Sequence, residues 1–341
     1  MFSRRSATLA AAALLAALVA APAAAQSEAE LKAQVARLKP KDFPTQPIEI
    51  TVVYPAGGGM DINARLVQKY FEKYTGEKAI VNNRTGGAGM IGHTWLATQA
   101  PKDGHAVGVI ASLVFGDAFI RAQGKWSLDD LEPITFLNNE GMNFVVATDG
   151  PYKDRSMKDI LELAKAKPNT LRMTVVPNTS WDTMISHVER LSGAKFLRVP
   201  FQGGLPGITA LIGGNVDVGI GFYGEIRGNL DGGKLKHLAV SGTGRAPFAP
   251  DSPTLNEMLG AKDITYGAIR WVTVPKGVPA DRKAWLEAAF RAATSDPELQ
   301  AEFKKLGTVP NPQMTTPQLV DFLKAAAAAE RETLVKTGQI K

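Results

Sequence analysis

A strand pattern runs directly into a glycine turn and a helix start in Ile48-Glu-Ile-Thr-Val-Val-Tyr-Pro-Ala-Gly-Gly-Gly-Met-Asp61. The part from Ile48 to Tyr54 is rich in β-branched residues, which favours a strand. The glycines permit a sharp turn, and the following helical spacing places four side chains on one face: Ile62, Leu66, Tyr70 and Tyr74. A strand, a turn and a helix in this order predict an α/β fold.

The same alternation continues along the chain. Further strands are expected over 78–82, 106–111, 143–148, 171–176, 196–201, 216–222, 235–240 and 264–275. Helices are expected near Met90, after Ser156, and over 280–294, 297–306 and 316–336. The chain is longer than a single small hydrophobic core usually stabilises, so two lobes are expected.

The first 25 residues have the features of a cleavable secretory signal. Arg4 and Arg5 precede an apolar stretch from Leu9 to Ala21, and small residues end the segment before Gln26. The stretch is shorter than the roughly 20 residues that span a bilayer. We expect export to the periplasm, a mature chain that begins near Gln26, and no membrane anchor. The Sec route is favoured, and Ser3-Arg4-Arg5 leaves the twin-arginine route open.

Composition narrows the function further. Cysteine is absent, which excludes disulfides, thiolate metal sites and a lipid-bearing cysteine. The sequence has 39 basic and 33 acidic residues, and removal of Arg4 and Arg5 leaves 37 − 33, a mature net charge of +4. The charges are dispersed, so nucleic acid is not an expected partner. A mildly positive chain favours anionic ligands.

Two local sequences resemble each other. Tyr54-Pro-Ala-Gly-Gly58 follows the first strand, and Pro200-Phe-Gln-Gly-Gly204 follows a later one. Each places an aromatic residue and a glycine pair between a strand end and a helix start. Bare N–H groups and the positive end of the helix dipole attract anions there. Two such turns that face each other would hold an anion from both sides.

A longer series of motifs accompanies these turns. It comprises Ile50-Thr-Val-Val-Tyr-Pro-Ala-Gly-Gly-Gly-Met-Asp61 with Ala64-Arg65, Val81-Asn-Asn-Arg84, Gly86-Gly-Ala-Gly-Met-Ile-Gly92, Ala100-Pro-Lys-Asp-Gly104, Phe201-Gln-Gly-Gly204, Leu211-Ile-Gly-Gly-Asn-Val-Asp217 and Gly233-Lys-Leu-Lys-His-Leu-Ala-Val240. In this order and spacing the sequence resembles the receptors of tripartite tricarboxylate transporters, the Bug family, over nearly the whole mature chain.

The resemblance implies a periplasmic-binding-protein type II architecture. Two α/β lobes would be joined by two crossing strands, placed at Thr148 and Gly267, and would close on a ligand in the cleft between them. The expected divisions are a signal peptide over 1–25, an N-terminal extension and linker over 26–47, a discontinuous lobe 1 over 48–148 plus 267–341, and lobe 2 over 149–266.

The resemblance also implies a function. The protein would be a periplasmic solute-binding receptor, not an enzyme, that captures a small carboxylate and delivers it to integral-membrane transporter subunits. No cofactor and no metal are expected, and the receptor would be a monomer. The ligand class stays open among aliphatic di- and tricarboxylates, acidic amino acids and aromatic carboxylates.

The family's binding positions fall on both expected lobes. In the first they are Tyr54, Gly57, Gly58, Asp61 and Ser112, and in the second Thr179, Ser180, Phe201, Gly203 and Gly204. Asp61 is assigned to capping the first helix and ordering the loop, because like charges repel. Thr179 and Ser180 begin a helix, so their hydroxyls either cap it or meet the ligand.

Four further residues are candidates for the same pocket: Gly89, Trp181, Tyr223 and Arg270. Trp181 and Tyr223 either line an aromatic pocket or pack in the core. Arg270 lies near the second expected crossing and either meets the ligand or forms an interlobe ion pair. The sequence departs from the family at Pro177-Asn-Thr-Ser180 and Gly221-Phe-Tyr-Gly224, which leaves the identity of the ligand open.

Other functions have weaker support. Gly87-Ala-Gly-Met-Ile-Gly92 matches a dinucleotide-binding pattern, but it follows the second strand and no acidic residue ends the next one. No Gly-x-Ser-x-Gly motif occurs, and His93, His105, His187 and His237 are scattered without metal-ligand spacing. A receptor that reports its ligand to a membrane sensor kinase would need the same pocket, so this alternative stays open.

Overall fold

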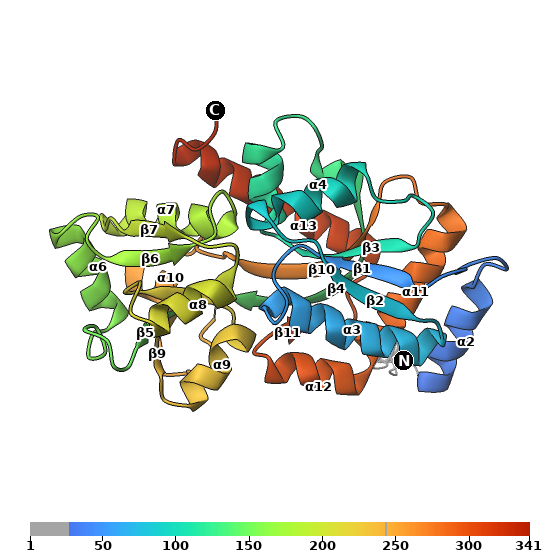
Figure 1. Ribbon diagram of the computed structural model, residues 1–341, viewed down its shortest axis with the longest axis horizontal. Coiled ribbons are helices and arrows are strands. Elements are labelled where there is room, and N and C mark those ends of the chain that lie inside the picture. Colours follow the sequence, from blue (N-terminus) through green and yellow to red (C-terminus); the bar gives the residue numbers. More distant parts are fainter. Residues whose placement is uncertain (1–26, 243) are drawn as a thin grey trace, which may run out of the picture.

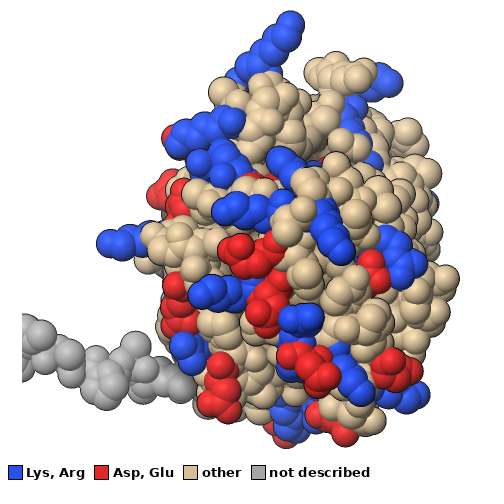
Figure 2. Space-filling view, turned by 90° about the vertical axis from the view of Figure 1, so that its left-hand side faces the viewer, with Lys and Arg blue, Asp and Glu red and all other residues tan. Residues whose placement is uncertain are grey.

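The computed structural model describes residues 27–242 and 244–341, which form two α/β lobes side by side (Figure 1). The predicted signal segment and the cleavage position near Gln26 lie outside this part of the chain. Within the described residues, no helix has the length and apolar character needed to cross a membrane. Basic and acidic side chains are interspersed on the outer face of the smaller lobe (Figure 2).

The larger lobe is built on a six-stranded sheet with the order β11-β4-β10-β3-β1-β2. Its strands are β1 (Ile48–Val52), β2 (Ala79–Asn83), β3 (Ala106–Ala111), β4 (Leu131–Gly141), β10 (Gly267–Pro275) and β11 (Val309–Pro310). β1 pairs in parallel with β2 and β3, while β10 runs antiparallel to β3 and β4. All residues of β3 are buried, as expected for a strand covered on both faces.

Helices surround this sheet. They are α2 (Glu28–Leu38), α3 (Gly59–Thr75), α4 (Met90–Thr98), α5 (Val114–Gly116), α11 (Ala280–Ser295), α12 (Pro297–Lys305) and α13 (Thr316–Lys336), with short turns at η2 (Gly87–Gly89), η3 (Asp117–Arg121) and η4 (Leu128–Asp130). On α3 the buried stripe includes Val67, Phe71 and Tyr74, whereas Ile62 and Leu66 of the predicted face are only half-buried.

The smaller lobe contains two separate strand groups. β5 (Asn143–Ala147) lies between β8 (Gly219–Gly221) and β9 (Leu235–Val240), and β6 (Arg172–Val175) pairs in parallel with β7 (Leu197–Pro200). A single bridge between Met173 and Val218 connects the groups. The helices of this lobe are α6 (Met157–Ala166), α7 (Ser180–Ser192), α8 (Gly204–Ile212), α9 (Tyr223–Asp231) and α10 (Leu255–Leu259).

The pairing of β5 bears on where the chain crosses between the lobes. The strand expected over 143–148 belongs to the sheet of the smaller lobe, where β5 pairs with β8 and β9. The chain therefore leaves the larger sheet at Gly141, at the end of β4, and not at Thr148. It returns at Gly267, the first residue of β10, where Gly267 pairs with Gly141.

The N-terminal stretch is part of the larger lobe and not a separate linker. Leu31 and Val35 of α2 are buried in the main core, and α2 packs against α3 and α11. Phe43, only 2% exposed, lies edge-on to Trp285 with ring centroids 5.5 Å apart. Residues 27–47 therefore pack against the larger lobe, although the expected division separates them from it.

Candidate ligand-binding site

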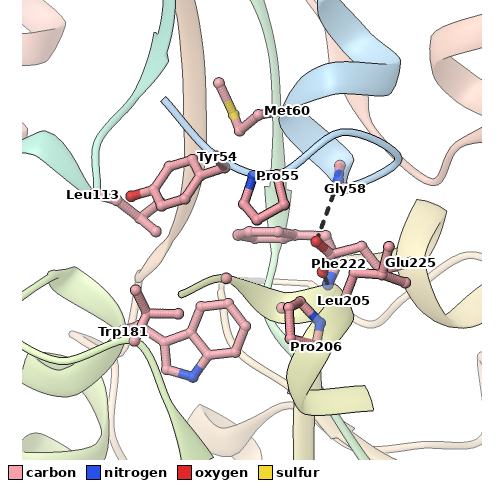
Figure 3. A pocket seen from close by; sticks show the side chains of 14 residues that line it. Tyr54, Pro55, Gly58, Met60, Leu113, Trp181, Leu205, Pro206, Phe222 and Glu225 are labelled. Carbon is pink, nitrogen blue, oxygen red and sulfur yellow. Dashed lines mark hydrogen bonds between the residues drawn. The ribbon is translucent and has the colours of Figure 1, made fainter. Parts of the chain in front are cut away.

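A small cavity lies between the two lobes, beside the glycine turns (Figure 3). Its volume of about 20 Å³ is enough for roughly one water molecule. The larger lobe contributes Tyr54, Pro55, Gly58, Gly59, Met60 and Leu113 to its walls. The smaller lobe contributes Val176, Trp181, Gly203, Gly204, Leu205, Pro206, Phe222 and Glu225. Both lobes therefore approach each other closely at the two glycine turns.

The first turn is ordered by the side chain of Asp61. Gly57 adopts a positive φ of +79°, and its N–H donates to Asp61 Oδ2 at 3.0 Å. Asp61 also accepts from Arg65 Nε at 2.9 Å and from Asn83 Nδ2 at 3.0 Å. Burial tends to raise the pKa of the Asp61 carboxyl, but these hydrogen bonds outweigh burial and lower it. Asp61 thus orders the loop, and it does not line the cavity.

The second turn touches the first across the cleft. A Cβ on Gly203 would lie 3.4 Å from Pro55 Cδ, and one on Gly57 would lie 3.6 Å from Leu205 Cδ2. Nearby, the N–H of Ala88 donates to Gln202 Oε1 at 2.7 Å, which adds a hydrogen bond between the lobes. The backbone is extended at both Gly58 and Gly203 and does not lie in the left-handed region, so glycine matters there because a bare backbone allows close approach.

Glu225 is the residue that the two turns enclose. Its Oε1 accepts from the N–H of Gly59 at 3.2 Å, and its Oε2 accepts from the N–H of Phe222 at 2.9 Å (Figure 3). A Cβ on Gly204 would fall 2.1 Å from Oε2. The helices α3, α8 and α9 all begin beside this carboxylate. The turns therefore surround an anionic group, as their sequences suggested, but that group belongs to the chain itself.

Two aromatic side chains whose rings line the cavity have unpaired polar atoms buried beside it. The Tyr54 hydroxyl and the Trp181 indole N–H are buried and have no hydrogen-bond partner among the described residues. Burial raises the pKa of the Tyr54 phenol, so the hydroxyl keeps its proton. Gly89, with φ of +99°, lies behind Tyr54, since a Cβ there would be 3.1 Å from the hydroxyl oxygen. Trp181 meets Phe222 edge-on at 5.8 Å.

Several predicted contacts lie away from the cavity. Thr179 caps α7, because its Oγ1 accepts from Trp181 N at 3.3 Å and donates to Val176 O at 2.8 Å. Ser112 joins β3 to β10 through a 2.8 Å hydrogen bond to Gly267 O. Ser112 and Ser180 line a second hollow of about 750 Å³ bounded partly by α13.

Two aromatic candidates also belong to the packing of the smaller lobe. Phe201 is half-buried against its minor hydrophobic cluster. Tyr223 stacks on Phe248 with ring centroids 3.7 Å apart. Neither side chain lines the cavity.

Arg270 is completely buried between the crossing strands. Its guanidinium pairs with Glu140 and donates from Nη1 to Asn138 Oδ1 at 3.1 Å and from Nε to Met60 Sδ at 3.3 Å. It also lies 4.9 Å over the Phe222 ring. The ion pair between β4 and β10 uses this cation, so Arg270 is not presented to the cavity.

Glu225 and Glu140 are the important residues that sequence reasoning missed. Glu225 stands three residues after Phe222 at a helix start, the spacing at which an acidic side chain reaches back to the cap N–H. That spacing was visible in the sequence. Glu140 gave no comparable signal, because its partner Arg270 is far away in the chain.

No group of three or more potential metal ligands occurs in the described part of the chain. The two α/β lobes have the fold of periplasmic binding proteins of type II. The chain belongs to the tripartite tricarboxylate transporter family receptors, whose family model matches residues 63–338.

Relatives and solved structures agree with this assignment. A UPF0065 protein from the gbd 5' region of Cupriavidus necator is 27% identical over 314 residues, which cover 91% of this chain and 93% of that protein. The periplasmic binding protein BugD has a TM-score of 0.79 at 24% identity and covers 87% of this chain and 99% of its own. MatC from Rhodopseudomonas palustris, solved with bound malate, has a TM-score of 0.78 at 22% identity, with 86% and 100% covered.

Proposed function

We propose that this receptor captures a small carboxylate-bearing solute between its two glycine turns and delivers it to membrane transporter subunits. The carrying observation is the convergence of the N-termini of α3, α8 and α9 on one point between the lobes, already occupied by a carboxylate. Helix N-termini favour anions because their N–H groups and dipoles point at the ligand.

Backbone and neutral donors would hold the ligand. Arg270 is paired with Glu140, so the cavity offers the backbone N–H groups of the turns, and the Tyr54 hydroxyl and the Trp181 indole N–H lie buried beside it without a hydrogen-bond partner among the described residues. The malate bound to MatC supports a carboxylate as the ligand class. Binding without turnover is the proposed role, since the walls combine glycine, proline and apolar side chains with these donors.

The two lobes would move as bodies about β4 and β10. The larger would comprise residues 27–141 and 267–341, and the smaller residues 142–266. We place the mature protein in the periplasm as a monomer, exported through the Sec route by the apolar stretch that follows Arg4 and Arg5.

A thermal-shift panel tests the ligand class. Malate, succinate, adipate and benzoate should include at least one compound that raises the melting temperature, whereas the corresponding amides and neutral sugars should not. A ligand at a hundred times its Kd stabilises the folded state by about 2.7 kcal/mol, which the assay detects. The amides are the matched controls, because they keep the shape and lose the charge. A shift caused only by amides or sugars would refute the carboxylate assignment.

A further inference from the structure

The position best suited to a ligand carboxylate is filled by Glu225. This side chain is 9% exposed and lies between the two turns, where it accepts one N–H from each lobe. The remaining cavity admits about one water molecule. An incoming carboxylate that uses the same donors must therefore approach Glu225 closely.

The charges around Glu225 do not neutralise it fully. Glu140 on β4 and Arg270 on β10 face it, but these two are paired with each other. Asp61 on α3 is held by Arg65, and Arg227 on α9 is half-exposed and turned toward Asp231 and Lys305. The first turn of α8 carries no charged residue. An ionised Glu225 therefore depends on backbone donors and helix dipoles, which a second carboxylate would have to share.

We propose that Glu225 is a specificity-determining residue that competes with the ligand carboxylate for these donors and must take up one proton before that carboxylate can bind beside it. This inference rests on the proposed function. In the bound state Glu225 would be neutral, with a proton drawn from solvent on one of its carboxyl oxygens. Its O–H group would donate a hydrogen bond to the ligand's carboxylate. Two carboxylates that share one site cannot both ionise at low cost.

The environment of Glu225 makes such protonation accessible. Burial raises the pKa of the Glu225 carboxyl, and nearby Glu140 raises it further. The N–H donors of Phe222 and Gly59 and the charge of Arg270 oppose that rise. A ligand carboxylate would add another negative charge at close range, so ligand binding and proton uptake at Glu225 should be coupled.

Calorimetric titration with malate, succinate and adipate tests the inference on the wild type, Glu225→Gln and Glu225→Ala. For a carboxylate that binds, the wild-type affinity should rise at least tenfold from pH 8 to pH 5. Proton uptake should be detectable from the difference between two buffers of unlike ionisation enthalpy. Both variants should bind at least tenfold more tightly than the wild type at pH 8 and should show little pH dependence, because the competing charge is gone.

Asp231→Asn is the matched control, since it removes one negative charge from the exposed end of the same helix. It should behave as the wild type. Equal affinities and equal pH profiles in wild type and Glu225→Gln would overturn the role of Glu225 and leave the receptor function standing. Failure of every protein to bind any of the three probes would instead remove the proposed carboxylate function, and the inference with it. Circular dichroism verifies that each variant is folded.

Discussion

Arg270 shows how burial changes the meaning of a charged residue. Its guanidinium is 0% exposed and paired with Glu140, and Asn138 satisfies another of its donors. Arg270→Ala would leave Glu140 buried without its counter-charge. Removal of one partner from a buried pair costs about 3–5 kcal/mol, so we expect a loss of that size in the free energy of unfolding, measured by urea denaturation.

Arg245→Ala is the control for that measurement. Arg245 pairs with Glu257 on the surface, where the two side chains are 46% and 47% exposed. Exposed pairs contribute about 0–1 kcal/mol because solvent screens them. If the two variants lost equal stability, the buried pair would not have the structural role described.

Individual site residues were predictable where a local pattern determines them. Tyr54, Gly58, Gly203, Gly204 and Trp181, which the turn sequences and the family resemblance assign to ligand binding, line the cavity, and their contact with a ligand stays a prediction. Thr179 was ambiguous, because a hydroxyl at a helix start suits both a cap and a ligand. Its full burial and its contacts with α7 decide for the cap.

Among the elements, α13 carries a buried carboxyl at a contact between the lobes. Glu330 is 5% exposed, and α13 packs against both β4 and α7. Burial raises the pKa of Glu330 to about 7, opposed by a hydrogen bond from Thr183. The folded protein therefore keeps this proton up to about pH 7, whereas the unfolded chain loses it near 4.5. Stability is lost as pH rises between these values.

The variant Glu330→Gln has no carboxyl to ionise at this buried position, so it avoids the loss of stability that the wild type shows as pH rises. We expect the variant to be more stable than the wild type at pH 8 by up to about 3 kcal/mol, and nearly equal to it at pH 4. Urea denaturation at the two pH values measures the difference. Glu332→Gln serves as the control, because Glu332 lies on the same helix but is 66% exposed. An advantage of Glu330→Gln that is equal at both pH values would contradict the linkage to ionisation.

The limits of sequence prediction are clearest for β4. The boundaries of β3, β9 and α13 match their expected ranges, because each has a regular hydrophobic or helical pattern. β4 was not predicted, since it contains Pro133 and the polar run from Asn138 to Glu140, residues that are depleted in strands. These polar side chains are stabilised by tertiary partners such as Arg270 and Asn63. A local pattern cannot contain that information.

For the molecule as a whole, the narrow cavity beside the glycine turns limits how a ligand enters. A space of about 20 Å³ admits no carboxylate of several atoms, so a ligand that binds between the turns requires the lobes to part first. The observed rate of ligand binding should then fall toward the opening rate as ligand concentration increases. Stopped-flow tryptophan fluorescence can follow this process, because Trp181 lines the cavity.

Trp181→Phe should remove most of that fluorescence change while calorimetry still detects binding. This control assigns the signal to the cleft and not to the other tryptophans. A rate that rose linearly with ligand concentration would mean that the ligand enters without prior opening of the lobes.

The sheet of the larger lobe takes its strands from two separate stretches of the chain, and this arrangement bears on the order in which the two lobes fold. The strands of the smaller lobe, from β5 to β9, follow one another in the chain, whereas the large sheet needs β10 and β11, which come after them, to pair with β4. Contacts between distant parts of a chain form slowly, because loop-closure entropy opposes them. We therefore expect the smaller lobe to form its contacts before the larger sheet receives its two C-terminal strands, β10 and β11. Pairing of β10 with β4 brings Arg270 to Glu140, so the cleft between the lobes should form late in folding.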